Sequence, residues 1–255
     1  MIKLENQISE WIGDYVKENN LSSLIVGISG GIDSAVTSTL CAMTDFNTKL
    51  VVMPIYQNKE ETKRGINHCT FLKKRFNNID IINLDLTDVY EALKHKIPNT
   101  YHNKFSLANT RARIRMTTLY AIAGGSNGIV VGTGNKVEDF GVGFFTKYGD
   151  GGVDISPIAD LMKSEVYQLA KILNINKEII NAPPTDGLWD DGRSDEDQLG
   201  VSYDDIEWAM TNKLDSDNID ACQSNIMKVY HKHRKQNLHK MKEIPIFKKH
   251  TIIKK

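Results

Sequence analysis

A glycine-rich turn between an apolar run and a helix-like stretch constrains the fold of this chain more than any other feature. The turn, Gly27 to Ser34, reads Gly-Ile-Ser-Gly-Gly-Ile-Asp-Ser. The apolar run Leu24–Val26 precedes it, and a helix-like stretch from Ala35 to Met43 follows it. We therefore expect a strand that ends at the turn and a helix that begins there.

The residue types in this turn suit an anion that is held together with a cation. Gly30 and Gly31 lack Cβ atoms, so an anion can approach the main chain closely. Ser29 and Ser34 add hydroxyl donors, and the free amides that open the helix point to the same place. Asp33 repels a phosphate unless a cation lies between the two groups. The turn therefore predicts a site for phosphate together with Mg²⁺.

The turn differs from other common phosphate loops. A Walker loop requires Gly-Lys-Ser/Thr where this chain has Gly-Ile-Asp-Ser, and no Gly-x-Gly-x-x-Gly follows an expected strand. The pattern Ser-Gly-Gly-x-Asp-Ser resembles the signature of the ATP pyrophosphatases, which cleave ATP between its α and β phosphates. The alternative is a glycine turn that serves chain geometry alone. The resemblance implies that the whole turn binds ATP: Gly27, Ile28, Ser29, Gly30, Gly31, Ile32, Asp33 and Ser34.

Strand-like and helix-like segments alternate along the chain. Apolar runs such as Leu50–Met53 and Ile129–Val131 are typical of strands that are buried on both faces. Their alternation with helices predicts an α/β fold, a doubly wound parallel sheet flanked by helices with a Rossmann-like arrangement. Ligands of such sheets bind at the carboxyl ends of strands, where Ser29–Ser34 and Gly132–Glu138 fall. The expected strands are 23–29, 50–56, 79–86 and 128–134, and the expected helices are 4–16, 33–43, 60–76, 107–124, 203–210 and 219–235.

Two long segments are expected to be loops. Lys96–Ser106 contains Pro98 and two asparagines, and Ala182–Gly200 combines Pro183-Pro184 with glycines and many acids. Long irregular segments in a compact domain are often lids or binding loops. We interpret Ala182–Gly200 as a lid that becomes ordered over ATP.

Charge and composition bound the function class. The 255 residues carry 32 basic and 32 acidic side chains, which removes a global argument for a nucleic-acid partner. The basic stretch 228–255 is either a solvated face or a holder of an anionic substrate. Three scattered cysteines favour reduced thiols and a cytoplasmic location. We find no signal peptide or membrane-spanning run, and we expect one domain over 1–255 without a fused glutaminase domain.

Further motifs extend the resemblance to one family. Asn109–Met116, Gly132–Glu138, Gly143–Gly152 and Pro184–Asp186 follow one another as they do in the ammonia-dependent NAD⁺ synthetases. Phe-Phe-Thr-Lys-Tyr-Gly-Asp-Gly-Gly is the most specific of these runs. The resemblance implies an adenine nucleotide alpha-hydrolase-like fold and a homodimer. It also implies the amidation of deamido-NAD⁺ with ammonia through an adenylated intermediate.

The same resemblance implies a role for each of several residues. Asp33 and Glu138 would hold Mg²⁺ and serve catalysis, and Asp150 would hold ammonium or take its proton. Phe144 or Phe145 would stack on the nicotinate ring. Further ATP contacts would come from Thr133, Lys163 and Thr185. Contacts with deamido-NAD⁺ would come from Arg113, Lys147, Asp154, His239 and Lys240.

Simpler interpretations remain beside these roles. Arg111 and Arg115 compete with Arg113, and the pairs His231-Lys232 and His233-Arg234 compete with His239-Lys240. The two phenylalanines could belong to the core, and Asp154 could be a turn acid. The spacing from Glu138 to Lys147 is one residue longer than in the commonest bacterial members, so we expect a bulge within Asp139–Val142.

Two other functions compete with the synthetase. One is another ATP pyrophosphatase, such as a tRNA thiolase or a GMP synthetase-like ligase. The other is a nucleotide-binding module without chemistry. Scattered cysteines argue against the thiolase, and the Phe144–Gly152 run argues against the GMP synthetase. A non-catalytic module is expected to lose its metal-binding or cationic residues, and this chain keeps them.

Overall fold

The computed structural model describes residues 3–184, 195–212 and 220–249. Its four strands form one parallel sheet in the order β3-β2-β1-β4. The strand order reverses between β1 and β4, which confirms the predicted doubly wound sheet. The strands are β1 (Ser23–Gly27), β2 (Asn47–Val52), β3 (Ile79–Asn83) and β4 (Gly128–Val131).

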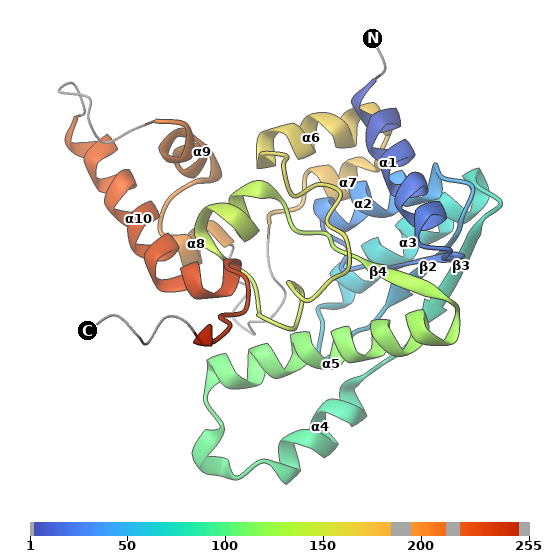
Figure 1. Cartoon of the computed structure of the whole chain (residues 1–255), viewed down its shortest axis with the longest axis horizontal. Helices are drawn as coiled ribbons and strands as arrows, with labels where there is room; N and C mark the ends of the chain where they lie inside the picture. Colours follow the sequence, from blue (N-terminus) through green and yellow to red (C-terminus); the bar gives the residue numbers. More distant parts are fainter. Residues whose placement is uncertain (1–2, 185–194, 213–219, 250–255) are drawn as a thin grey trace.

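Helices cover both faces of this sheet (Figure 1). One face carries α1 (Leu4–Glu18), α2 (Ile32–Ala42), α3 (Lys59–Arg75), α6 (Lys163–Ile172) and α7 (Lys177–Ile180). The other face carries α4 (Thr87–Lys96) and α5 (Lys104–Gly125), joined through the 3₁₀ turn η1 (Asn99–Tyr101). Away from the sheet lie α8 (Asp195–Leu199), α9 (Tyr203–Thr211), α10 (Ala221–Met241) and the π-helix η2 (Lys136–Val142).

The central strand β1 contributes side chains to two separate core layers. Leu24 and Val26 belong to the layer under α2 and α6, whereas Ile25 belongs to the layer under α5. Successive side chains of a strand point to opposite faces, so one apolar run serves both layers. This arrangement explains why the strands read as continuous apolar runs.

A third apolar cluster packs η2 against α9 and α10. Val137 and Val142 of η2 meet Ile206 of α9 and Met227 of α10, all of them buried. This cluster contains no strand residue, so η2, α8, α9 and α10 share a small core of their own. We call these four elements the helical part. The cluster therefore attaches the last helices to a segment that leads directly out of β4.

The structure corrects several predicted boundaries. The strands predicted over 50–56, 79–86 and 128–134 end at Val52, Asn83 and Val131. Pro54 lacks an amide for the sheet ladder, and Gly132 donates instead to the carbonyl of Ile155, outside the sheet. The residues predicted beyond these ends therefore belong to the loops at the carboxyl edge of the sheet.

Two predicted loops also contain regular structure. Asn103 caps α5 by accepting from the Ser106 amide, so the helix begins inside the predicted loop Lys96–Ser106. Helix α8 lies inside the predicted loop Ala182–Gly200. Residues 185–194, which include Thr185 and most of the predicted lid, lie outside the described residues.

The expected bulge after Glu138 is confirmed. Asp139–Val142 belongs to the π-helix η2, whose wider turn accommodates an additional residue.

Helix α10 extends to Met241, six residues beyond the predicted end at Lys235, and this longer helix packs against η2. Within the described residues, no helix combines the length and apolarity needed to cross a bilayer.

Candidate active site

The predicted phosphate loop joins β1 to α2 in the expected conformation. Gly30 has a φ of +89°, and a Cβ there would lie 2.3 Å from the carbonyl oxygen of Glu61. Glycine is therefore required both by the backbone conformation and by the close approach of α3. The hydroxyl oxygens of Ser29 and Ser34 lie 3.1 Å apart, and the Gly31 amide donates to Ser29 Oγ. No side chain caps α2, so its first amides remain for an anion.

A cavity of about 580 Å³ opens beside this loop at the carboxyl ends of the strands. The loop lines this cavity, and so do Gln57 and, from α5, Arg115. Asn237 and Lys240 from the end of α10 also reach the cavity. Ligand-sized space thus lies where strand order predicts it.

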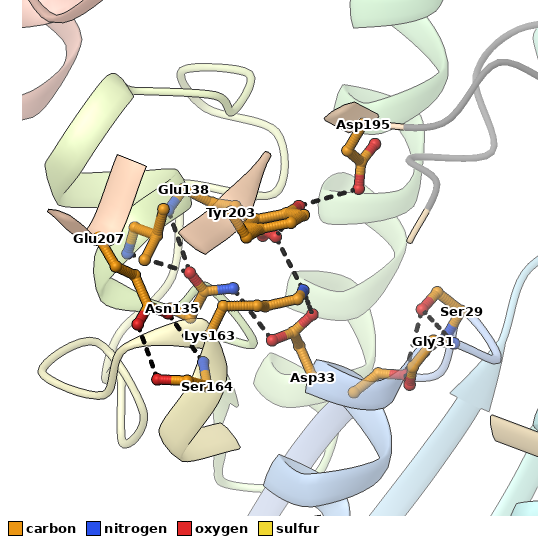
Figure 2. A network of polar contacts seen from close by, with 12 residues as sticks. Ser29, Gly31, Asp33, Asn135, Glu138, Lys163, Ser164, Asp195, Tyr203 and Glu207 are labelled. Carbon is orange, nitrogen blue, oxygen red and sulfur yellow. Dashed lines mark hydrogen bonds and ion pairs between the residues drawn. The ribbon is translucent and has the colours of Figure 1, made fainter. Parts of the chain in front are cut away.

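Three charged side chains from distant segments meet at the edge of this cavity. Lys163 Nζ lies 2.6 Å from Asp33 Oδ2 and 2.9 Å from Glu138 Oε1 (Figure 2). Asp33 stands in the first turn of α2, Glu138 in η2, and Lys163 at the start of α6. The lysine side chain is 3% exposed. The structure thus brings together the two predicted metal ligands and the predicted ATP contact.

Asn135 fixes the relative position of the two carboxylates. Its Nδ2 donates to Asp33 Oδ1 at 3.0 Å, and its Oδ1 accepts from the Val137 and Glu138 amides. The residue is fully buried and caps the helix that presents Glu138. Sequence reasoning missed Asn135, although it lies within the Gly132–Glu138 motif.

Burial and charge oppose each other in this cluster. Burial lowers the pKa of Lys163, but the charges of Asp33 and Glu138 outweigh it and hold that pKa above its ordinary value. Burial raises the pKa of Glu138, but the charge of Lys163 and the hydroxyl of Tyr203 outweigh it and leave the pKa lowered. The pKa of Asp33 is raised, because burial exceeds the effect of Lys163. An ammonium group between two carboxyl groups is therefore the stable form.

Helix α9 adds two residues that sequence reasoning did not single out for a role. Tyr203 donates its hydroxyl to Glu138 Oε1 at 2.6 Å (Figure 2), and that hydroxyl also lies 3.2 Å from Asp195 Oδ2. Glu207 accepts from the amide and hydroxyl of Ser164, the residue after Lys163. No local motif marks these residues, because both act across a tertiary contact.

Asp150 and Thr133 line the cavity, as their predicted roles require. Asp150 Oδ1 accepts from the Thr146 amide at 3.0 Å, and burial raises the pKa of its carboxyl group. Phe144 and Phe145 line the cavity too, and Phe145 lies against Gly151, where a Cβ would come within 2.2 Å of the ring. Phe144 also packs on the third apolar cluster, so both the binding and the core interpretations retain support.

The predicted deamido-NAD⁺ contacts divide into two groups. Arg113 donates to the carbonyl of Lys147, and Lys147 Nζ lies 3.4 Å from the carbonyl of His239, so these three residues are neighbours. None of them lines the cavity. Asp154 stands elsewhere and accepts from the Val130 amide and the Tyr120 hydroxyl. These contacts tie Asp154 to β4 and α5, so they are tertiary contacts and not the local hydrogen bonds of a turn acid.

Among the three competing tail pairs, only His239-Lys240 reaches the cavity, through Lys240. Lys240 Nζ donates to the carbonyl of Phe145 at 2.6 Å and lies 4.9 Å from the centre of its ring. In the rival pairs, Arg234 donates to carbonyls of η2 and His233 contacts the carbonyl of Leu199. Both of these contacts hold the helical part together.

Arg115, not Arg113, is the arginine of α5 that lines the cavity. Its Nε donates to the carbonyl of Met53 and its Nη2 to Gln57 Oε1, at 3.0 and 2.7 Å. Burial lowers the pKa of Arg115 to about 10, which still leaves the guanidinium charged at neutral pH. Arg115 thus adds a partly covered cation to the lining of the cavity, besides Lys163.

Comparisons with known proteins agree with this geometry. The profile of the family described as NAD synthase matches residues 4–250. The NH(3)-dependent NAD(+) synthetase of Alkaliphilus oremlandii is 41% identical over 209 residues, which cover 78% of this chain and 80% of that protein.

Two solved structures share the whole architecture. NMN synthetase from Francisella tularensis has a TM-score of 0.85 and 30% identity, with 95% of this chain and 96% of that chain covered. NH3-dependent NAD synthetase from Campylobacter jejuni has a TM-score of 0.77 and 27% identity, with 96% and 98% covered. The similarity therefore includes the helical part as well as the sheet.

Proposed function

This chain belongs to the NAD synthase family, and on that premise we propose that it converts deamido-NAD⁺, ATP and ammonia to NAD⁺, AMP and pyrophosphate. The nicotinate carboxylate attacks the α-phosphorus of ATP, and the bond from that phosphorus to the bridging oxygen breaks to release pyrophosphate. Ammonia then attacks the acyl carbon, the bond from that carbon to the AMP oxygen breaks and AMP leaves, and the nitrogen loses one proton to a base, which leaves the NH₂ of the amide.

The single observation that carries the proposal is the Asp33–Lys163–Glu138 cluster beside an uncapped glycine loop. The loop amides and the hydroxyls of Ser29 and Ser34 suit the phosphates that leave as pyrophosphate. Lys163 places a positive charge at the same edge of the cavity. The loop lacks a Walker lysine, which fits cleavage at the α-phosphorus better than transfer of the γ-phosphoryl group.

Mg²⁺ is part of the proposal, and the donor set fits it. Asp33 and Glu138 already hold one cation between them, the ammonium of Lys163. No group of three or more acidic, histidine or cysteine side chains capable of holding a metal occurs in the described part of the chain. Mg²⁺ typically takes one or two carboxylates and completes its shell with phosphate and water. When bound, it supplies positive charge to the phosphates.

The chain's own residues supply the remaining requirements. Lys163 turns from the carboxylates to a phosphate oxygen, and Asn135 keeps Asp33 and Glu138 in place during that exchange. Thr133 and Thr185 complete the ATP contacts. Asp150 holds ammonium at the cavity and accepts its proton, and its raised pKa suits that task.

Deamido-NAD⁺ is proposed to contact Arg113, Lys147, Asp154 and the His239-Lys240 pair, with Phe145 against the nicotinate ring. Lys147 and His239 adjoin one another outside the cavity, and Lys240 lies inside it. A long dinucleotide that enters the cavity by one end would meet both groups. Burial lowers the pKa of Lys240, an effect that its neighbours Asp150 and Asp139 partly offset.

The protein is further proposed to be a cytoplasmic homodimer. Large apolar side chains stand exposed along α4, η1 and α5, at Val89, Leu93, Tyr101, Phe105 and Tyr120. A second copy of this chain would cover them. All three cysteines are free thiols, which suits a reducing compartment.

The test is an assay with ATP, Mg²⁺, ammonium and deamido-NAD⁺ that follows NAD⁺ together with AMP, ADP, pyrophosphate and phosphate. We expect NAD⁺, AMP and pyrophosphate in equal amounts. ADP and phosphate in place of AMP and pyrophosphate would contradict the proposal. Release of pyrophosphate without an amide product would favour another ATP pyrophosphatase.

A second candidate substrate is nicotinate mononucleotide, because the structural neighbour with a TM-score of 0.85 is an NMN synthetase. The same chemistry would amidate the same ring on a shorter nucleotide. Comparing kcat/KM for the two acids in the same assay decides between them. A preference of more than about tenfold, or 1.4 kcal/mol, for the mononucleotide would replace the first candidate.

A further inference from the structure

Helix α9 presents one side chain to the charged cluster, Tyr203, and one to the start of α6, Glu207. Tyr203 opens the helix, and Glu207 lies four residues later, so the two stand one above the other. Figure 2 shows Tyr203 pointing toward Glu138 and Lys163, and Glu207 pointing toward Ser164. The helix itself is held by Ile206 and Ala209 in the third apolar cluster.

Tyr203 contacts both partners of the Glu138–Lys163 ion pair. Its hydroxyl donates to Glu138 Oε1 at 2.6 Å, and its ring centre lies 4.9 Å from Lys163 Nζ. Lys163 donates to the same Glu138 oxygen at 2.9 Å. Glu138 Oε1 therefore accepts two hydrogen bonds, one from a cation and one from a neutral phenol. Tyr203 itself is only 6% exposed.

Glu207 ties this arrangement to the helix that carries Lys163. Its two carboxylate oxygens accept from the Ser164 amide at 2.8 Å and from the Ser164 hydroxyl at 2.7 Å. Lys163 and Ser164 are the first two residues of α6, so Glu207 satisfies a free amide at that helix end. Tyr203 is thereby fixed relative to both Glu138 and Lys163.

The second donor on Glu138 has a consequence for ATP binding. Lys163 can meet a phosphate only by weakening its bonds to the carboxylates. A buried carboxylate that loses its donor is costly, and a hydrogen bond from a neighbour that stays in place reduces that cost. Tyr203 is such a neighbour, because it donates to Glu138 without depending on Lys163.

We propose that Tyr203 is a positioning residue that keeps Glu138 hydrogen-bonded when Lys163 turns to ATP. The inference rests on the proposed function, because it assumes that Lys163 binds a phosphate of ATP. Tyr203 acts through Glu138 and Lys163 and need not touch the substrate. Its removal weakens ATP binding and leaves deamido-NAD⁺ binding unchanged.

The test is calorimetric titration of the whole protein with ATP and MgCl₂ in the absence of deamido-NAD⁺, so that no turnover occurs. Tyr203→Phe removes the hydroxyl and keeps the ring over Lys163. We expect its Kd for ATP to rise about tenfold, the effect of losing one hydrogen bond to a charged acceptor. In steady-state kinetics, KM for ATP should rise more than kcat falls, with KM for deamido-NAD⁺ unaltered.

Tyr230→Phe is the matched control. Tyr230 is 8% exposed, belongs to the same apolar cluster, and has no hydroxyl contact with the charged cluster among the described residues. We expect its Kd for ATP to stay within about twofold of wild type. Should both variants weaken ATP binding equally, the effect belongs to the apolar cluster and the proposal is wrong.

A double variant identifies the route of the effect. In Glu138→Gln the acceptor has lost its charge, so Tyr203→Phe added to it should change the Kd for ATP little further. An equal tenfold loss in both backgrounds would overturn the proposal, and so would wild-type ATP affinity in Tyr203→Phe. Wild-type protein that binds no ATP would instead overturn the proposed function.

A second substitution tests the same idea if Tyr203→Phe does not fold. Glu207→Ala removes the tie between α9 and α6, and we expect it to weaken ATP binding in the same direction. Glu207→Gln keeps an acceptor for the Ser164 amide and a partner for its hydroxyl, and we expect it to restore the affinity. Wild-type affinity in Glu207→Ala would contradict the positioning role.

Discussion

At the scale of single residues, Asp33 and Glu138 share the ammonium group of Lys163. The charge state of each of these three side chains therefore depends on the other two. The three residues are far apart in sequence, and Lys163 follows Asp33 by 130 positions. Asn135 and Tyr203 supply the neutral hydrogen bonds that hold the carboxylates where the ammonium meets them. A change of charge at one of the three charged residues therefore changes the pKa values of the other two.

Asp33→Asn and Glu138→Gln keep side-chain shape and remove one negative charge each. We expect kcat to fall by at least about 100-fold in either variant, because the charge is needed where the phosphates gather. The measurement is kcat at limiting Mg²⁺, with thermal melting by circular dichroism to verify folding. A folded variant that retains near wild-type activity would show that the metal assignment is wrong.

His68 predicts a pH dependence of stability that is separate from catalysis. Its Nε2 lies 2.9 Å from Ser38 Oγ between α2 and α3, and burial lowers its pKa from 6.5 to about 4. Between pH 6.5 and 4 the unfolded chain binds a proton at His68 that the folded protein does not. Stability is therefore complete above pH 6.5 and falls with pH by about 3 kcal/mol through this window.

Urea unfolding at pH 7 and at pH 4 measures this effect. Wild type should lose about 3 kcal/mol more than His68→Gln between the two pH values. His95→Gln is the control, because the His95 side chain is 79% exposed, and it should keep the wild-type dependence. The same pH dependence in wild type and His68→Gln would contradict the prediction.

At the scale of elements, the contact between α10 and η2 connects the tail to the active site. Asn237 donates to the carbonyl of Val142, and Arg234 donates to the carbonyls of Phe140 and Gly141. These carbonyls lie at the carboxyl end of η2, where a positive side chain is favoured by the helix dipole. The helix that presents Glu138 is thus held at its start by Asn135 and at its end by α10.

Gly143 is the point where this contact tolerates no side chain. Its φ is +69°, and a Cβ would lie 2.5 Å from the Cβ of Asn237. We expect Gly143→Ala to lower the free energy of unfolding by about 2–3 kcal/mol. Gly124→Ala is the control, because nothing lies within 4 Å of a Cβ at that position in α5.

Chemical denaturation of both variants provides the measurement. Gly124→Ala should be neutral or more stable by up to about 1 kcal/mol, since alanine is the better helix former. Equal stability of wild type and Gly143→Ala would mean that α10 can move away from η2 without cost. Close packing of α10 against Gly143 would then be excluded.

At the scale of the whole molecule, the chain offers no thiol suited to take nitrogen from glutamine. Such a transfer needs a nucleophilic thiolate. Cys41 and Cys69 are buried in the core, and burial raises the pKa of both thiols, that of Cys69 to about 12. Cys222 is exposed at the start of α10 and does not line the cavity.

We therefore expect the purified protein to use ammonium and not glutamine. NAD⁺ formation is followed with each donor in turn, after contaminating ammonia has been removed enzymatically from the glutamine. Rates with glutamine should be below about 1% of those with ammonium, a difference of nearly 3 kcal/mol. Comparable rates would require a glutaminase site that the described residues do not provide.

The proposed dimer is tested at the same scale. Light scattering should give twice the chain mass of 28.7 kDa. Phe105→Glu places a charge among the exposed apolar side chains of α5 and should shift the protein toward monomer. Ile172→Glu introduces the same charge at an exposed apolar position on α6 and should leave the dimer intact. Monomeric wild type would exclude the dimer.

The sequence by itself determined the local chemistry and the class of fold. The glycine loop, the apolar strands and the first turn of α2 are encoded by neighbouring residues, so their conformation and the position of Asp33 could be predicted. The strand ends were predicted less well, because Pro54 and the contacts of Gly132 end strands whose apolar pattern continues. Helix α4 was missed, since it buries only Tyr90 and leaves Val89 and Leu93 exposed.

Only the tertiary structure decided which charged residues meet. Arg111, Arg113 and Arg115 look alike in sequence, yet among them only Arg115 lines the cavity, because α5 buries that face against Met53 and Gln57. Tyr203 and Glu207 carry no motif, and their contacts depend on a separate apolar core that packs α9 beside η2 and α6. The spacing of apolar residues in the sequence shows which face of a helix is apolar. It does not show which distant side chains that face contacts. The conformation of the glycine loop could therefore be predicted from the sequence, whereas the hydrogen-bond network of Asp33, Glu138, Lys163 and Tyr203 could not.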